Sequence, residues 1–319
     1  MISAQELTMR FGPVLALDRA TFEVRPGEVV GLLGPNGAGK STAMKILTTY
    51  LYPSGGAATV SGHSILTEPL EVRKKIGYLP EILPLYMDME TRDYLAFVGR
   101  ARGLRGERLA RRMRWVVEKC GLGPMYRKII RELSKGFRQR AALAQALIHD
   151  PEVIILDEPT SGLDPHQILE IRELVRELGR ERTVILSTHI LQEAEALSDR
   201  LLIISRGRIV GNGTLEELRK EAIGRERVRL CVLSPPGEVL QALAEVGVGG
   251  ARLADDSRGI STLTVEAPVG SDLVGRIGNL AVTKHWELRC LASQPFSLEE
   301  IFLALAEPES AGRPTGGGA

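Results

Sequence analysis

The sequence is poor in aromatic residues and cysteine, and its charges nearly cancel. Phe, Trp and Tyr make up 4% of the 319 residues, and the three cysteines, Cys120, Cys231 and Cys290, form no CxxC pair. This spacing argues against a disulfide framework or a zinc site on paired cysteines, and it is typical of a reducing compartment. The formal net charge of +1 gives no bulk-charge reason to expect a nucleic-acid or membrane partner.

Long apolar runs are also absent. Stretches such as RLLIIS and EVIILD have the length of buried strands and are far shorter than the roughly 18 residues that a membrane span needs. The N-terminal MISAQELTMRFG has no apolar core of signal-peptide length. We therefore expect a cytoplasmic protein without a membrane span, which can still dock on the inner face of a membrane through a partner.

The sequence does contain an alternation of strand-like and helical patterns up to about Gly213. TFEV, residues 21–24, is expected to form the first strand. The segments VVGLL, VIIL and TVIL are apolar on both faces, which indicates a parallel sheet covered by helices. The alternation itself predicts an α/β core. We place this first domain at residues 1–220.

Within that domain, strands give way to helical patterns between about Leu83 and Asp150, which predicts a helical insertion over residues 83–150. The insertion contains the arginine-rich stretch GRARGLRGERLARRMR. Such a charge run is most often a solvated helix face, and a contact with a partner or with lipid headgroups is the alternative.

After Lys220 the pattern changes to β-α-β-β-α-β, with the last strand expected over VTKHWELRCLA, residues 282–292. This is the order of a ferredoxin-like α+β domain. We place this second domain at residues 221–306. Its last helix is predicted to open at Ser297, where Glu300 completes a capping box. Residues 307–319 are rich in Pro and Gly, and we expect a disordered tail there.

The segment GPNGAGKST fits the pattern G-x-x-x-x-G-K-[ST] and lies between a predicted strand and a predicted helix. Its glycines let backbone N–H groups surround a phosphate, and the following helix points its positive end at the same place. Lys40 is expected to reach the β- and γ-phosphates of a nucleotide, and the Ser41 hydroxyl to bind Mg²⁺. The residues predicted to bind nucleotide here are Gly34, Pro35, Asn36, Gly37, Ala38, Gly39, Lys40, Ser41 and Thr42.

Two acids and a histidine end apolar strands further along the chain. Asp157 and Glu158 end VIILDEP, and neighbouring residues at a strand end point to different sides. Asp157 is predicted to hold the Mg²⁺ shell, and Glu158 to act as the base for the attacking water. His189 ends TVILSTH and is predicted to donate a hydrogen bond to the γ-phosphate.

Taken together these motifs resemble the ATP-binding subunits of ABC transporters. ELSKGFRQRAALAQAL looks like the signature segment, usually LSGGQ, and the remaining motifs follow in family order: GPNGAGKST as Walker A, YLPE in the place of the Q-loop, VIILDEP as Walker B, SGLD as the D-loop and STH as the His switch. The resemblance covers about Leu7 to Gly213. It implies a P-loop NTPase (RecA-like) core that binds ATP and Mg²⁺.

The signature segment has its own physical interpretation. Ser134 is well placed as the N-cap of an Ala- and Leu-rich helix, and with Gly136 it forms a second anion-binding end. In the family this end faces the γ-phosphate held by another cassette, so the resemblance implies a head-to-tail dimer with a second copy or a similar cassette. Asp164 of the D-loop is expected at the same nucleotide. The sequence departs from the common signature at Lys135 and Phe137.

Two further positions are predicted on the same resemblance. Phe11 occupies the place of an aromatic ring that stacks on adenine, with core packing as the alternative. Glu81 stands where the family more often has Gln, and is expected to join the Mg²⁺ shell and couple the site to a partner; a plain loop acid is the alternative. An ionised carboxylate accepts hydrogen bonds but cannot donate one, so Glu81 would bind mainly through the metal.

The function predicted from these features is an ATPase that drives export through a separate membrane permease. The segment SLEEIFLALA resembles the extension of single-cassette export ATPases, and the apolar ILPLYMDM after Glu81 is a candidate permease contact. The alternative is a soluble ABC-type ATPase acting on ribosomes or nucleic acid, which usually has two cassettes or a long coiled coil. A P-loop kinase or GTPase leaves the signature segment unexplained. We expect no nucleic-acid partner.

Overall fold

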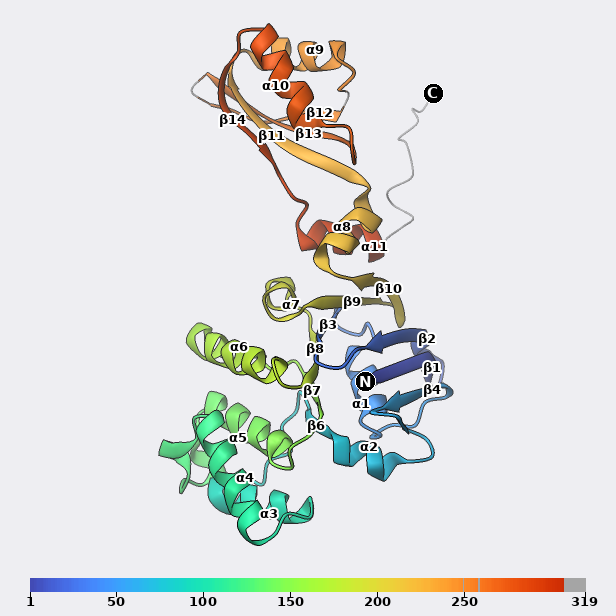
Figure 1. Cartoon of the computed structure of the whole chain (residues 1–319), viewed down its shortest axis with the longest axis vertical. Coiled ribbons are helices and arrows are strands. Elements are labelled where there is room, and N and C mark those ends of the chain that lie inside the picture. Colours follow the sequence, from blue (N-terminus) through green and yellow to red (C-terminus); the bar gives the residue numbers. More distant parts are fainter. Residues whose placement is uncertain (249, 258, 307–319) are drawn as a thin grey trace. The chain divides into compact units, whose positions relative to one another are not determined.

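In a computed structural model the chain is described over residues 1–248, 250–257 and 259–306. It divides into two compact units, Met1–Thr214 and Leu215–Ala319 (Figure 1). The predicted boundary at residue 220 lies inside helix α8 (Leu215–Ile223), which packs against α11 (Leu298–Ala306) and therefore belongs to the second unit. The predicted disordered tail, residues 307–319, lies outside the described residues.

The first unit is built around a sheet with strand order β10-β9-β3-β8-β7-β6. Its strands are β3 (Val29–Leu33), β6 (Ile76–Leu79), β7 (Val153–Asp157), β8 (Thr183–Thr188), β9 (Arg200–Ser205) and β10 (Arg208–Gly213). Strand β10 pairs antiparallel to β9, and the other neighbours are parallel. Every residue of β3, β7 and β8 is buried, which confirms the expectation of a sheet covered on both faces.

Each face of this sheet belongs to a different hydrophobic core. Along β7, Ile154 and Leu156 pack on one side while Val153 and Ile155 pack on the other, as the two-residue repeat of a strand requires. The first core includes residues of α5 (Lys135–Leu147), α6 (Pro165–Gly179) and α7 (Leu191–Leu197). The second includes α1 (Lys40–Leu47), which lies between this sheet and a second sheet near the N-terminus (Figure 1).

That N-terminal sheet has the antiparallel order β2-β1-β4-β5, and only part of β2 was predicted. Its strands are β1 (Ile2–Phe11), β2 (Val14–Val24), β4 (Gly55–Val60) and β5 (His63–Ser64), and helix α2 (Pro69–Lys75) follows. In β1 the buried positions change from Ile2 and Ala4 to Leu7 and Met9. The change occurs at Glu6, whose φ of 49° marks an irregularity in the pairing. Such a bulge breaks the alternation by which a strand is recognised in a sequence.

The predicted insertion contains α3 (Thr91–Ala101), α4 (Gly106–Lys119) and α5, with short 3₁₀ turns at Gly123–Met125 and Ile130–Glu132. Arginines of the charged run make structural contacts. Arg102 Nη1 donates to the carbonyl oxygen of Arg73 at 2.6 Å, and the Arg112 guanidinium lies 4.2 Å from the Trp115 ring centre and 3.2 Å from Asp150. Arg112 therefore stabilises the fold and is no simple solvated charge.

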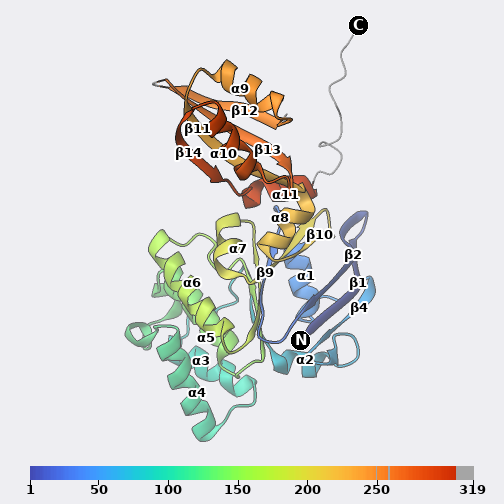
Figure 2. The same cartoon turned by 45° about the horizontal axis from the view of Figure 1, so that its top comes forward.

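The second unit has the predicted β-α-β-β-α-β order. Its elements after α8 are β11 (Arg225–Leu233), α9 (Pro236–Glu245), β12 (Gly250–Ser257), β13 (Ile260–Pro268), α10 (Leu273–Thr283), β14 (Glu287–Ser293) and α11. The antiparallel sheet has the order β12-β13-β11-β14, with α9 and α10 packed on one face (Figure 2). Residues 282–284 were predicted to start the last strand, but Val282 and Thr283 end α10 and Lys284 is its C-cap. The predicted capping box is confirmed, since Ser297 and Glu300 exchange backbone-to-side-chain hydrogen bonds of 2.8 and 3.3 Å.

Two cysteines that are distant in the sequence are neighbours in this sheet. Cys231 of β11 pairs directly with Cys290 of β14, and both are free thiols. The third, Cys120, is fully buried in the first unit, and burial raises the pKa of its thiol to about 12.

Among the described residues, no helix combines the length and the apolar character that crossing a membrane requires.

Candidate functional site

The phosphate-loop motif lies where the sequence placed it, between β3 and α1. Gly39 has a φ of 109°, and a Cβ there would lie 2.5 Å from the carbonyl oxygen of Ala16. A Cβ at Gly34 would lie 2.4 Å from the carbonyl oxygen of Ile204. No other residue type fits either position, so the loop holds its tight curve only with glycine.

A cavity of about 600 Å³ opens beside this loop. The residues lining it are Phe11, Ala16, Asn36, Gly37, Gly39, Lys40, Ser41, Thr42, Glu81, Glu158, Ser161 and His189. Segments far apart in the sequence therefore meet at one hollow, as the predicted nucleotide site requires. Phe11 is 46% exposed at the end of β1, which contradicts the alternative that it packs in the core.

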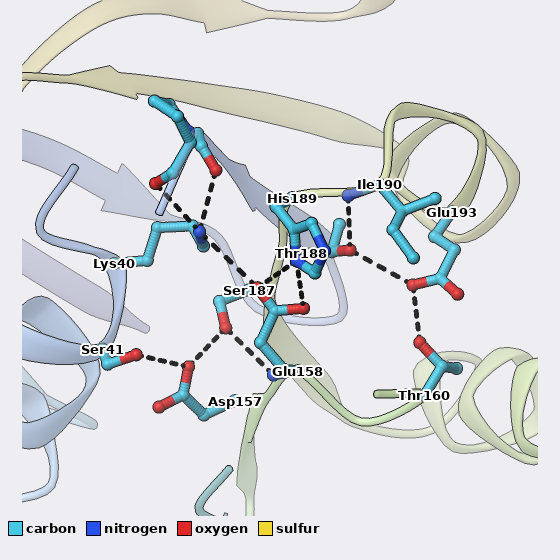
Figure 3. Close-up of polar contacts among 12 residues, drawn as sticks. Lys40, Ser41, Asp157, Glu158, Thr160, Ser187, Thr188, His189, Ile190 and Glu193 are labelled. Atoms are coloured by element: carbon cyan, nitrogen blue, oxygen red, sulfur yellow. Dashed lines mark hydrogen bonds and ion pairs between the residues drawn. The ribbon is translucent and has the colours of Figure 1, made fainter. Parts of the chain in front are cut away.

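Asp157 and Ser41 lie together at the floor of the site. Asp157 ends β7, is 1% exposed, and its Oδ1 accepts hydrogen bonds from Ser41 Oγ at 3.1 Å and Ser187 Oγ at 2.5 Å (Figure 3). The Ser187 hydroxyl in turn accepts a hydrogen bond of 3.1 Å from the backbone N–H of Glu158. A buried hydroxyl thus connects the two neighbouring acids.

Glu158 turns away from Asp157 because its backbone has a φ of 51°, in the left-handed region that side-chain-bearing residues rarely adopt. Its carboxylate lies 3.0 Å from Nδ1 of His189 and 3.5 Å from Nζ of Lys40 (Figure 3). Lys40 also donates to the carbonyl oxygens of Gly34 at 2.8 Å and Pro35 at 3.2 Å. The carboxylate is therefore held between a lysine and a histidine at the edge of the cavity.

The contact with Glu158 also assigns the histidine tautomer. An ionised carboxylate only accepts hydrogen bonds, so Nδ1 of His189 carries the proton that it donates. Nε2 is then an acceptor in the neutral ring and a donor only in the imidazolium. The predicted hydrogen bond from His189 to a phosphate therefore requires the charged ring if it uses Nε2.

The oxygen donors here suit a magnesium ion. Mg²⁺ prefers carboxylate, hydroxyl and phosphate oxygens, and usually takes one or two carboxylates with its remaining ligands from substrate and water. Ser41 and Asp157 supply such a pair, and Glu81 lines the same cavity. Within residues 1–248, 250–257 and 259–306 no group of three or more His, Cys, Asp or Glu could hold a metal. This donor set fits a cation that arrives with a phosphate.

Seven predicted residues are not among those that line the cavity: Gly34, Pro35 and Ala38 of the phosphate loop, Asp157, and the more distant Ser134, Gly136 and Asp164. Ser134 is the N-cap of α5, as predicted, and its Oγ accepts from the N–H of Phe137 at 3.4 Å. Asp164 caps α6, and its Oδ1 accepts from the N–H of Gln167 at 2.9 Å. A Cβ on Gly136 would lie 2.5 Å from the Gln167 side chain. The two helix starts are thus packed together.

Sequence reasoning missed Ala16, Ser161 and Ser187. Ser187 pairs with Asp157 in the register of β7 and β8, so a hydroxyl directly across from the predicted metal acid was the available signal. Ser161 is the first residue of the D-loop motif SGLD, of which only Asp164 was assigned to the site. Ala16 lies in β2, a strand of which only the end was predicted, so no sequence signal pointed to it.

Known proteins resemble this chain over most of its length. A protein-family model described as "ABC transporter" matches residues 17–161. The daunorubicin resistance ATP-binding protein DrrA3 of Streptomyces coeruleorubidus is 37% identical over 299 residues, covering 93% of this chain and 92% of that protein. The Nod factor export ATP-binding protein I of Burkholderia thailandensis is 33% identical over 315 residues, covering 97% of each chain.

Solved structures agree in fold. An ATP-binding subunit of an ABC transporter has a TM-score of 0.64 and 31% identity, and the match covers 69% of this chain and 92% of that one. The dimeric ATP-binding cassette MJ0796, bound to ADP and Pi, has a TM-score of 0.62 at 24% identity over 67% of this chain and 99% of its own. At that identity the second similarity supports the fold alone.

Proposed function

The chain belongs to the family of ABC transporter ATP-binding subunits, which are ATPases, and from that membership we propose that it hydrolyses ATP with Mg²⁺ to drive export through a separate permease. The export direction rests on relatives that are named for drug resistance and for Nod factor export. Family membership gives the ATP-binding core, whereas the roles of individual residues belong to the proposal.

One observation carries the assignment of the chemistry: the Glu158 carboxylate is 7% exposed yet lines the cavity, within 3.5 Å of Lys40 Nζ and 3.0 Å of His189 Nδ1. A carboxylate at this place can accept a proton from a water that attacks the terminal phosphate. His189 orients the carboxylate through Nδ1. Lys40, freed from the loop carbonyls by a bound triphosphate, stabilises negative charge on the β- and γ-phosphates.

Asp157, the acid next to Glu158, has a different role, the binding of the metal ion. Asp157 and Ser41 would hold Mg²⁺, which when bound neutralises charge on the β- and γ-phosphate oxygens. Glu81, two residues after the end of β6, lines the same cavity and would contact that ion. Phe11, half exposed beside the cavity, supplies a flat surface for the base.

The signature residues fit a dimer. Ser134 and Gly136 lie at the start of α5, outside the cavity of their own chain. A helix N-terminus attracts phosphate, so this end can complete the site of a second copy or a similar cassette. Asp164 caps the neighbouring helix α6 and is placed to join the same contact.

The permease contact is proposed at the apolar segment after Glu81. Ile82 is 86% exposed, and Tyr86 and Phe97 are exposed with ring centres 5.5 Å apart. Exposed apolar groups gathered in this way commonly mark a protein interface. Ile82→Glu should reduce co-purification with the permease from detergent extracts while ATP turnover stays unchanged; Leu169→Glu, an exposed leucine on α6, is the matched control.

The test of the proposed function is Glu158→Gln. This variant should bind ATP and form an ATP-dependent dimer by size-exclusion chromatography, while ATP turnover falls by at least about 100-fold, the loss of a general base. Unchanged hydrolysis would remove Glu158 as the base. Recovery of the wild-type protein with ribosomes or DNA, and not with a membrane protein, would favour the alternative function.

A further inference from the structure

A buried carboxylate lies behind the Glu158–His189 pair, and none of the motifs accounts for it. Glu193, in the first turn of α7, is 2% exposed. Its Oε2 accepts hydrogen bonds from Thr160 Oγ1 at 2.6 Å and from Thr188 Oγ1 at 3.1 Å (Figure 3). One oxygen atom thus joins the turn after β7 to the end of β8.

These two threonines are next to the reacting side chains in the sequence. Thr160 follows Glu158 after one intervening proline, and Thr188 directly precedes His189. Both threonines are at most 2% exposed. The Glu193 carboxylate therefore fixes the backbone on each side of the 3.0 Å contact between the Glu158 carboxylate and His189.

The chemistry of a carboxylate explains why an acid is suited to this position. An ionised carboxylate oxygen only accepts, so both threonine hydroxyls must donate to it. With its proton committed, Thr188 Oγ1 presents a lone pair to the backbone N–H of Ile190, which donates to it at 3.0 Å. Glu193 thus orients the backbone just after His189 through Thr188.

The other carboxylate oxygen is less well paired. Oε1 has no hydrogen-bond partner in the part of the chain that the structure describes, and Nη2 of Arg172 on α6 lies 3.7 Å away. Burying a charge so incompletely paired is costly, and an apolar residue would pack here at lower cost. If the side chain at this position only stabilised the fold, it would not need to carry a charge.

We infer that Glu193 is a positioning residue for ATP hydrolysis, holding Glu158 and His189 in register through Thr160 and Thr188. The inference rests on the proposed function, because it concerns the rate of that reaction. It requires loss of Glu193 to lower kcat and to leave ATP binding almost unchanged. The phosphate loop contacts this network through the Gly34 N–H, which donates to the Thr188 carbonyl oxygen at 3.4 Å, and through Lys40, 3.5 Å from Glu158, and neither contact uses the Glu193 carboxylate.

The experiment compares Glu193→Ala with the conservative Glu193→Gln, whose amide oxygen can accept both threonine hydrogen bonds. Glu193→Ala should lower kcat about 10- to 100-fold with KM for ATP within about threefold of wild type, and Glu193→Gln should restore at least a third of the wild-type kcat. Glu195→Ala, an exposed acid on the same helix, is the control and should keep wild-type values. Thermal unfolding of each variant measures any loss of stability separately.

A double-mutant cycle tests whether Glu193 acts through Thr160. Thr160→Val should lower kcat several-fold in the wild-type background and less than about twofold in the Glu193→Ala background, because the acceptor is already gone. If Glu193→Ala does not fold, Glu193→Met, whose apolar side chain has a similar length and lacks the carboxylate acceptor, replaces it in the cycle. Wild-type turnover per folded molecule in Glu193→Ala, or independent losses in the cycle, would overturn the inference.

A second measurement separates this inference from the proposed function. Hydrogen exchange at the Ile190 amide should be faster in Glu193→Ala than in wild type and in Glu195→Ala, whether or not the protein turns over ATP. An inactive wild-type protein with this exchange pattern would refute the proposed function alone. Unchanged exchange at Ile190 would refute the network that the inference depends on.

Discussion

Replacing Ser187 with Ala tests whether the two neighbouring acids depend on the hydroxyl that connects them. The change removes a 2.5 Å hydrogen bond to the buried Asp157 carboxylate and a 3.1 Å bond accepted from the N–H of Glu158. A hydrogen bond to a charged group contributes about 1.5–3 kcal/mol. The N–H of Glu158 keeps its 3.2 Å hydrogen bond to the carbonyl oxygen of Ser187, so this N–H still has an acceptor after the hydroxyl is removed.

The expected cost of Ser187→Ala is therefore about 2 kcal/mol, mainly at Asp157. If the hydrogen bond keeps Asp157 and Glu158 placed for the reaction, the same energy lowers kcat roughly 30-fold, since 1.4 kcal/mol is a factor of ten. KM for ATP should change little, because Lys40 and the phosphate loop are untouched.

The assay combines steady-state ATP hydrolysis with urea unfolding. Thr183→Val is the matched control: it removes a buried hydroxyl from the same strand, one that accepts a 2.9 Å bond from the N–H of Gly27 far from the acids. The control should lose stability and keep its turnover. If Ser187→Ala loses about 2 kcal/mol of stability but hydrolyses ATP at the wild-type rate, the reasoning is refuted.

Three further predictions concern the same unit. Lys40→Ala should weaken ATP binding itself by at least about tenfold, measured by titration with a fluorescent ATP analogue, because the Nζ charge facing the phosphates is lost; wild-type affinity would refute its role. Glu81→Gln should keep most ATP turnover, since Glu158 is the base, and damage as severe as that of Glu158→Gln would contradict this division of labour. Burial, with the charge of nearby Arg102, lowers the pKa of His149 from 6.5 to about 4, so the unfolded chain takes up the proton first as pH falls. The free energy of unfolding, measured with urea, should be highest above pH 6.5 and fall by up to about 3 kcal/mol towards pH 4, and it should fall by less in His149→Gln. If both proteins lose the same stability, His149 is not the cause of the pH dependence.

Much of the cassette could be predicted because its signals are local. The strands of the parallel sheet are continuous apolar runs, and the phosphate loop is a contiguous motif whose glycines are required by backbone geometry at Gly34 and Gly39. The capping box at Ser297 and the N-cap at Ser134 are likewise encoded within a few residues. Strand β1 was missed because the irregularity at Glu6 interrupts its alternation.

The sequence by itself determined the α/β core, the order of the second unit and the identities of the residues expected at the nucleotide. It could not show contacts between residues that lie far apart in the chain, because these depend on strand register and on helix packing. Only the tertiary structure set Ser187 against Asp157, turned Glu158 towards His189 through a left-handed backbone, and paired Cys231 with Cys290. It also buried Glu193 behind the site, where threonine hydroxyls from the turn after β7 and from the end of β8 donate to one oxygen of its carboxylate.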